Sequence, residues 1–203
     1  MARVAADVRR GELVDATIKV ALAEGLEAAT VRRIAQEAGV PLGTVHYCFG
    51  SKRALLEAVV EQVAQPDIQV ELDAGRTYTV AEVIRCAFRS YWSAAGGNRD
   101  RQRLVYELVN HLVRQDDPGP RLARLIFQRA YAAVDKVLAD QHDRFGELPL
   151  SRELLSRMVT AVTDGVALAW IADQDDELAL EVLDGFAAVF GLALGSFAGT
   201  SDG

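Results

Sequence analysis

The sequence predicts an all-α protein of about nine helices, with a small N-terminal domain followed by a larger C-terminal one. No segment shows the sustained alternation of apolar and polar residues that marks a half-buried strand. Segments rich in Ala, Leu, Glu and Arg instead repeat their apolar residues at helical spacing. Short clusters of Gly, Asn, Asp and Pro, which favour turns, separate these segments.

The first 64 residues contain signals for four helices. We expect them over residues 10–24 and 31–38, in a short segment between residues 39 and 47, and over residues 51–64. Gly25, in the left-handed conformation, and Gly39 are placed to end the first two helices. Thr30 and Ser51 are placed to cap the second and the fourth. Pro41 suits the first turn of the third helix, where its missing N–H is no loss.

The remaining residues predict five longer helices. These cover residues 80–95, 101–114, 119–141, 151–172 and 176–197. The less regular stretch that follows the fourth helix places a domain boundary within or just after that helix. We therefore expect one domain over residues 1–50 and another over residues 51–203, connected by the helix over residues 51–64.

Charge is distributed unevenly along the chain. Its 203 residues include 22 basic and 29 acidic ones, and the net charge of −7 argues against a protein that coats nucleic acid without selectivity. Eight basic and eight acidic residues balance within the first 64 positions, so the whole excess lies beyond them. Such asymmetry can mark a surface for a charged partner at one end of a chain.

Cysteine usage and hydropathy predict a cytoplasmic location. Cys48 and Cys86 are too few and too isolated for a disulfide framework or a zinc site. The first ten residues hold three arginines and no apolar leader segment. The longest apolar stretch, residues 186–198, is interrupted by glycine and serine and is shorter than the roughly 20 residues that span a bilayer. We expect no association with a membrane.

Residues 30–56, TVRRIAQEAGVPLGTVHYCFGSKRALL, contain the most informative pattern. A helix, a short turn with a glycine and a second short helix describe a helix-turn-helix, whose second helix can enter the major groove of DNA. The residues expected to form its small core are Ile34, Ala35, Val40, Val45 and Phe49. Their burial leaves a second set facing solvent or a ligand, namely Leu42, Gly43, Thr44, His46 and Tyr47.

Positive charge flanks this second set of residues. Four basic residues and one acidic residue lie between positions 28 and 53, a local net charge of +3. Lys52 and Arg53 stand at the start of the fourth helix, where unpaired backbone N–H groups and the positive end of the helix dipole already favour an anion. This arrangement fits the phosphates of a nucleic acid.

The run GVPLGTVHYCFGSK, residues 39–52, followed by RALL, resembles the DNA-binding domain of the TetR family of bacterial transcriptional regulators. The likeness covers about residues 10–63, and the chain departs from the family pattern at His46 and Cys48. The residues that the resemblance places in DNA contact are Thr30, Arg32, Arg33, Leu42, Gly43, Thr44, His46, Tyr47 and Lys52. Within this set, Leu42, Gly43 and His46 are implied to face base edges and Arg32 to reach bases from the preceding helix. Arg3, Arg9 and Arg10 are candidates for a basic arm.

A single short recognition helix makes few base contacts, and paired copies read two half-sites about 34 to 36 Å apart. The last two helices carry apolar stripes and resemble the family's dimerisation pair, so that two copies would form a four-helix interface. The residues expected at this homodimer interface are Leu155, Met158, Val162, Val166, Val182, Phe186, Val189 and Phe190.

Most large aromatic rings lie in the fifth to eighth predicted helices, within residues 80–172. A pocket among bundle helices with a few polar groups is a usual small-molecule site. The residues expected to line it are Phe88, Tyr91, Trp92, Tyr106, Asn110, His111, Phe127, Arg129, Tyr131 and Trp170. An effector bound there is expected to shift the fourth helix and so change the separation of the two recognition helices.

The predicted function is that of a homodimeric repressor, which binds a palindromic operator in double-stranded DNA and is released by a small apolar or amphipathic effector. The alternative is a helical protein that binds a small molecule or lipid and has no sequence-specific DNA binding; a gel-shift titration distinguishes the two. An enzyme is not expected, because no phosphate-binding glycine motif or HExxH is present and His111 and His142 lack partners at catalytic spacing. We expect no cofactor and no metal.

Overall fold

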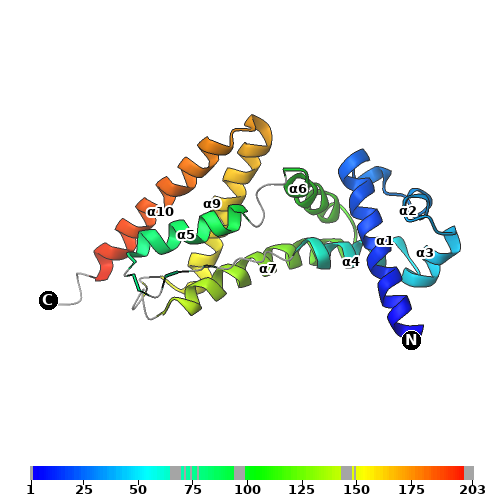
Figure 1. The fold of residues 1–203 in the computed structure, drawn as a ribbon, viewed down its shortest axis with the longest axis horizontal. Coiled ribbons are helices and arrows are strands. Elements are labelled where there is room, and N and C mark those ends of the chain that lie inside the picture. Colours follow the sequence, from blue (N-terminus) through cyan, green and yellow to red (C-terminus); the bar gives the residue numbers. More distant parts are fainter. Residues whose placement is uncertain are drawn as a thin grey trace. The chain divides into compact units, whose positions relative to one another are not determined.

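The computed structural model describes residues 2–64, 70, 72–73, 75–76, 78–93, 99–142, 148 and 150–198, with the backbone alone at residues 2–5, 80 and 194–198. Over these residues the chain forms nine α-helices, one short 3-10 helix and no strand, which confirms the predicted all-α fold (Figure 1). The elements are α1 (Ala2–Glu24), η1 (Leu26–Ala28), α2 (Val31–Glu37), α3 (Leu42–Phe49), α4 (Lys52–Val63), α5 (Val80–Tyr91), α6 (Arg99–Val113), α7 (Gly119–Asp140), α9 (Arg152–Asp173) and α10 (Asp176–Ala198).

Helix boundaries near the N-terminus follow the predicted capping residues closely. The Oγ of Thr30 accepts a hydrogen bond from the backbone N–H of Arg33 at 3.2 Å, and the Oγ of Ser51 accepts one from Ala54 at 3.1 Å. Both caps satisfy N–H groups that have no partner within their own helix. Pro41 stands at the N-cap of α3, one position before the first turn in which it was predicted.

The first helix and its end differ from the prediction. α1 begins at Ala2 and not near residue 10. Gly25 has a φ of +88° and a ψ of 157°, so its backbone is not in the left-handed helical conformation that we predicted. This extended geometry leads the chain directly into η1, which the sequence pattern did not indicate. The predicted end of the fifth helix, residue 95, lies outside the described residues.

The chain divides into two compact units. Unit 1 comprises Met1–Gln65 and Arg103–Phe127, and unit 2 comprises Pro66–Gln102 and Gln128–Gly203. Residues 103–113 of α6 and 119–127 of α7 therefore belong with the four N-terminal helices, while residues 99–102 of α6 and 128–140 of α7 belong to unit 2. The predicted division into domains over residues 1–50 and 51–203 concerns parts that fold independently, and it remains a prediction.

The core of unit 1 orients the short helix α3. Val45 and Phe49 on one side of α3 are 3% and 7% exposed, and they pack in one cluster with Ile34 and Ala35 of α2, while Val40 packs against that cluster. The small core predicted for the helix-turn-helix is therefore confirmed. The same cluster includes buried residues from α1, α4, α6 and α7, among them Leu13, Leu55, Val59, Leu104, Leu108, Ala123 and Ile126.

Arg10 joins α1 to the C-terminal end of α3. Its guanidinium donates a hydrogen bond to the backbone carbonyl of Cys48 and lies 4.3 Å from the ring centroid of Phe49. The last carbonyls of a helix lack intrahelical partners and carry the negative end of its dipole, so a cation stabilises them. Arg9 forms an ion pair with Glu12 at 2.6 Å. These two arginines are thus part of a helix and not of the suggested arm, and the side chain of Arg3 lies outside the described residues.

Unit 2 is built around the packing of α5 along α10 (Figure 1). A Cβ at Gly191 would lie 2.4 Å from the Cβ of Ala81, so the two helices can approach this closely only because residue 191 is glycine. On the outside, the Arg89 guanidinium donates to the Asp184 carboxylate at 2.6 Å, and this hydrogen bond raises the pKa of Arg89. The buried cluster around them includes Phe88, Trp92, Val166, Trp170, Leu183 and Ala187.

We expect Phe49→Ala to lower the free energy of unfolding by about 3 to 5 kcal/mol, because truncating a buried ring leaves a cavity in the core of unit 1. Tyr47→Ala is the matched control on the same helix. Its ring is 87% exposed, and its loss should change the free energy by no more than about 0.5 kcal/mol. Urea unfolding followed by circular dichroism measures both variants. Equal losses of unfolding free energy in the two variants would contradict the burial of only one side of α3.

Arg10→Ala should destabilise the protein by about 1 kcal/mol, because it removes a charge-assisted hydrogen bond and a cation–π contact at the end of α3. Arg9→Ala deletes the same side chain one position earlier, where the ion pair with Glu12 is half exposed and contributes little. Urea unfolding of the two variants compares the positions directly. A loss in Arg9→Ala as large as in Arg10→Ala contradicts the capping role of Arg10.

Candidate functional site

The side of α3 opposite its buried residues forms an exposed face, which we call the α3 face and define by Leu42, Gly43, Thr44, His46 and Tyr47. Leu42 is 47% exposed and Tyr47 is 87% exposed, Gly43 and His46 are exposed, and Thr44 is half-buried. The predicted division of this helix into a buried and an accessible side is thus present. Contact of these residues with DNA bases or phosphates remains a prediction.

Two further predicted contacts lie at helix N-termini in unit 1. Lys52 is exposed in the first turn of α4, and Arg53 beside it forms only a loose ion pair with Glu57 at 3.6 Å. Thr30 is exposed at the N-cap of α2. Since its oxygen accepts the backbone N–H of Arg33, its hydroxyl proton is directed away from that bond and can be donated to a phosphate oxygen. These positions combine positive charge with backbone or hydroxyl donors.

Arg32 and Arg33 have different environments although they are neighbours in the sequence. Arg32 is exposed, whereas the Arg33 guanidinium donates to Glu24 at 2.7 Å and pairs with Glu37 at 2.9 Å. The bonds from Glu24 and then Glu37 raise the pKa of Arg33, and bonds from Lys19 and Arg33 lower the pKa of Glu37. Arg33 thus links the end of α1 to α2, with two carboxylates balancing its charge. Arg32 carries the accessible charge of the pair.

The helices α9 and α10 present a large exposed apolar face, which we call the α9–α10 face. Its exposed large residues are Leu154, Met158, Leu168, Leu178, Val182, Phe186, Val189 and Leu192. A hollow on this face is bordered by residues of both helices, including Val162, Gly165, Leu178, Val182 and Phe186. Among the described helices, α9 is the one that is long and apolar enough to cross a membrane by composition, and its apolar residues divide between this face and the core of unit 2.

Some of the predicted dimer residues lie on the α9–α10 face and others lie in the core of unit 2. Met158, Val182, Phe186 and Val189 are exposed on the α9–α10 face, and Val162 and Phe190 are half-buried. Leu155 and Val166 are 3% and 9% exposed, so they are covered by their own chain. Leu154, which belongs to the apolar stripe predicted for this helix, and Leu168 are 45% and 58% exposed.

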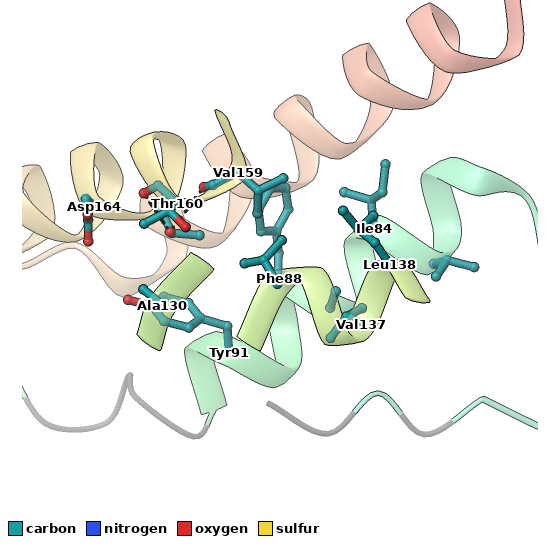
Figure 2. A pocket seen from close by; sticks show the side chains of 13 residues that line it. Ile84, Phe88, Tyr91, Ala130, Val137, Leu138, Val159, Thr160 and Asp164 are labelled. Carbon is teal, nitrogen blue, oxygen red and sulfur yellow. Dashed lines mark hydrogen bonds between the residues drawn. The ribbon is translucent and has the colours of Figure 1, made fainter. Parts of the chain in front are cut away.

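Unit 2 also contains a partly open cavity of about 70 Å³ lined by residues of α5, α7 and α9 (Figure 2). Its walls are almost entirely apolar. The lining residues are Val83, Ile84, Ala87, Phe88, Tyr91, Ala130, Val134, Val137, Leu138, Val159, Thr160, Thr163 and Asp164. An engineered apolar cavity of about 150 Å³ in another protein binds benzene, so this cavity is small for a ligand of more than a few atoms.

Of the ten residues predicted for a ligand pocket, Phe88 and Tyr91 line this cavity. Trp92 and Trp170 instead pack edge to face in the core of unit 2, with ring centroids 4.7 Å apart. Two other predicted residues of unit 2, Arg129 and Tyr131, lie outside the described lining. The remaining four, Tyr106, Asn110, His111 and Phe127, belong to unit 1.

Polar groups gather at one end of the cavity. Figure 2 shows Asp164 and Tyr91 at this end and Ile84, Val137 and Leu138 at the other. The Tyr91 hydroxyl accepts a hydrogen bond from Gln102 at 3.3 Å, and burial together with the negative charge of Asp164 raises the pKa of Tyr91 to about 12. Tyr91 therefore stays protonated at neutral pH. None of the polar residues at this end was predicted for the pocket except Tyr91, although Asp164 stands out in sequence as a charge within an apolar helix.

Comparison with known proteins identifies the first unit. Residues 13–59 match the family model of bacterial regulatory proteins of the tetR family. These residues run from within α1 to within α4 and include the whole helix-turn-helix.

Similarity to other proteins extends over most of the chain. The HTH-type nicotine-responsive transcriptional repressor HdnoR of Paenarthrobacter nicotinovorans is 26% identical over 178 residues, which cover 86% of this chain and 89% of HdnoR. The crystal structure of the multidrug binding protein EbrR complexed with ethidium is 27% identical, with a TM-score of 0.63 over 86% of this chain and 96% of that one. FadR from Bacillus subtilis, in complex with stearoyl-CoA, has the same fold, with a TM-score of 0.65, 18% identity and coverage of 88% and 95%.

The family match and the similarity to HdnoR agree with the geometry of unit 1, whose short helix α3 buries one side and exposes the other beside basic residues. Proteins with these features act in transcription and not as enzymes. Residues 13–59 therefore form a DNA-binding domain like that of the tetR family of bacterial regulatory proteins, and the chain is a DNA-binding transcriptional regulator.

Proposed function

We propose that this regulator is a homodimeric repressor that binds a palindromic operator and is released from it by a small apolar or amphipathic effector. The observation that carries the proposal is the accessible α3 face, flanked by Lys52 and Arg53 at the start of α4. HdnoR, to which the chain is similar over most of its length, is a repressor that responds to a small molecule. Such a protein acts in the cytoplasm, where its operator is.

In this proposal α3 enters the major groove. Leu42, Gly43 and His46 face base edges, where Leu42 can contact the methyl group of thymine and His46 can bond to a base edge. Lys52 approaches a phosphate together with the backbone N–H groups at the start of α4, which attract an anion through the helix dipole. Phosphate contacts fix the position of the protein on the duplex, and base contacts provide its sequence preference.

The α9–α10 face supports the proposed dimer. Its eight exposed large apolar residues form stripes on two adjacent helices, and exposed apolar surface of this extent is typical of a protein interface. Gly165 and Gly185 on the same helices are exposed and have open space at the position of a Cβ, which permits another helix to approach closely. A second copy of the chain would supply two matching helices, giving a self-complementary four-helix interface.

Effector binding in the cavity would act on unit 1 through α7. Ala130, Val134 and Val137 of this helix line the cavity, while Ala123 and Ile126, earlier in the same helix, are buried in the core of unit 1. A ligand that expands the cavity displaces the later turns of α7, and the continuous helix carries this displacement to its earlier turns. The sequence predicts α4 as a connection between the two domains, and α6 and α7 are further candidates because each has residues in both units. Release requires that the effector bind the two conformations with different affinity.

The role of Lys52 can be tested by salt dependence. We expect Lys52→Ala to weaken binding to every duplex alike and to reduce the slope of log K against log salt by about one, because one phosphate contact is lost. Lys136→Ala is the matched control, since Lys136 lies on α7 in unit 2 and is 73% exposed. Fluorescence anisotropy titrations from low to moderate salt measure both slopes. An unchanged slope in Lys52→Ala would remove this residue from the DNA interface.

The dimer can be tested at the centre of α10. Val189 is 63% exposed on the α9–α10 face, and Val189→Asp should place a charge in the proposed interface. Sedimentation velocity should then show a shift from twice the chain mass towards the 22.0 kDa of one chain, with helicity retained by circular dichroism. Val113→Asp, at a 53% exposed position of α6 outside this face, should leave the dimer intact. A Val189→Asp protein that remains dimeric contradicts the interface.

A further inference from the structure

The hydroxyl group of Tyr91 can donate a hydrogen bond to a ligand in the cavity of unit 2. Tyr91 lines this cavity, and Figure 2 shows it at the end away from Ile84 and Leu138. Gln102 donates a hydrogen bond to the Tyr91 oxygen at 3.3 Å, and among the described residues this is the bond that the hydroxyl makes. The proton of the hydroxyl is not used in that bond. Because burial and the charge of Asp164 raise the pKa of Tyr91 to about 12, this proton is present at neutral pH.

The other hydroxyl groups of the cavity already donate their protons within α9. The Thr160 hydroxyl donates to the backbone carbonyl of Ser156 at 2.8 Å, and the Thr163 hydroxyl donates to the carbonyl of Thr160 at 2.9 Å. Each hydroxyl has one proton, so neither threonine can donate to a ligand without losing its bond in the helix. Among the lining residues that the structure describes, Tyr91 is therefore the donor available to a ligand.

The cavity offers no free counter-charge to an ionic ligand. None of the described lining residues is basic, and Asp164 is the one acidic residue among them. The Asp164 carboxylate already interacts with another group of the chain. Moving an unpaired charge from water into apolar surroundings is costly, whereas a neutral polar group needs only a hydrogen-bond partner. A ligand of this cavity is therefore expected to be uncharged.

The end of the cavity away from Tyr91 fits a narrow apolar body. The walls there are aliphatic and comprise Val83, Ile84, Val134, Val137 and Leu138. The volume of about 70 Å³ favours a slender chain over a large ring system. An acceptor atom that enters with such a chain loses its hydrogen bonds to water, and this loss is costly unless a donor replaces them.

We propose that the ligand of this cavity is a neutral carbonyl compound, such as a ketone, whose apolar chain lies among the aliphatic residues and whose oxygen accepts a hydrogen bond from Tyr91. In this proposal Tyr91 determines ligand specificity, because it provides the donor that a carbonyl requires and an alkane does not. That the compound is also the effector rests on the proposed function above, whereas its binding to the cavity does not.

Tyr91→Phe tests the hydrogen bond, because it removes the hydroxyl and keeps the ring. The probes are 2-hexanone and 2-methyl-1-hexene, which have nearly the same shape and differ in having an oxygen or a methylene group on the same carbon. Ligand-observed NMR titrations use the full chain without DNA. The affinity for the ketone should fall about fivefold or more in Tyr91→Phe, because its buried carbonyl loses the donor, and the affinity for the alkene should stay within about twofold.

Tyr131→Phe is the matched control for the loss of a hydroxyl. Tyr131 lies on α7 outside the described lining, and its ring, which a phenylalanine retains, lies 4.7 Å from the Arg157 guanidinium. This variant should keep both affinities. Equal changes for the two probes in Tyr91→Phe, an unchanged affinity for the ketone, or no binding of the ketone to the unsubstituted chain overturns the proposal.

Charged compounds of similar length test the requirement for a neutral ligand. Hexanoate and hexylamine are ionised at neutral pH, and each should bind at least tenfold more weakly than 2-hexanone, because the cavity provides no free partner for either charge. A preference for hexanoate or for hexylamine over the ketone contradicts the proposal.

The carbonyl stretching frequency of bound 2-hexanone reports the hydrogen bond directly. In the unsubstituted protein this frequency should lie below that of the ketone in hexane, and in Tyr91→Phe it should return towards the hexane value. Infrared difference spectra measure both. A frequency in the unsubstituted protein equal to that in hexane shows that Tyr91 does not donate to the carbonyl.

These measurements are independent of the repressor proposal, because no DNA is present. If the ketone binds as described but does not lower the affinity for an operator, the carbonyl site stands and the effector mechanism fails. If the protein binds and releases DNA but Tyr91→Phe does not weaken the ketone, the carbonyl site fails and the repressor proposal stands.

Discussion

The burial of one side of α3 is the constraint on which the DNA-binding function depends. A helix of eight residues has no stability of its own in water, so its conformation and orientation must come from its neighbours. Val45 and Phe49 provide this by packing into the cluster of α1, α2 and α4, and the Arg10 guanidinium binds the last turn. These contacts fix the rotation of α3 about its axis, so the residues of the α3 face are directed away from the core of unit 1.

The cavity in unit 2 places a second constraint on function. Under the effector proposal, a ligand changes the affinity for DNA only by the difference between the free energies with which it binds the two conformations, and couplings of about 1 to 3 kcal/mol are typical. The helices α6 and α7 each have residues in both units, so the proposed coupling can run through the backbone of either helix.

Local signals allowed most of the N-terminal unit to be predicted. Thr30, Ser51 and Gly39 mark helix ends through interactions within a few residues, and the spacing of Val45 and Phe49 places them on one side of a helix. The environment of other side chains depends on contacts between segments that are distant in the sequence. Arg33 lies beside Arg32 in sequence, but successive residues of a helix point about 100° apart, and this rotation brings Arg33 to the carboxylate of Glu24.

The cavity could not be predicted in the same way. Large aromatic residues suggested a pocket, but large rings fill space, and Trp92 and Trp170 pack against each other. The cavity instead lies where small side chains such as Ala87 and Ala130 leave room between helices, a property of tertiary packing that no single segment encodes. The rotation about the helix axis likewise decides that Leu155 is buried while its neighbour Leu154 is exposed on the α9–α10 face.

The most direct test of the account is the selection of bound duplexes from a random pool at low ionic strength. Two copies of the α3 face acting together should enrich an inverted repeat, with half-site centres about 10 base pairs apart or a multiple of that spacing. Enrichment of unpaired half-sites would contradict the symmetric dimer. A pool that shows no enrichment after repeated rounds would contradict the reading of bases by α3.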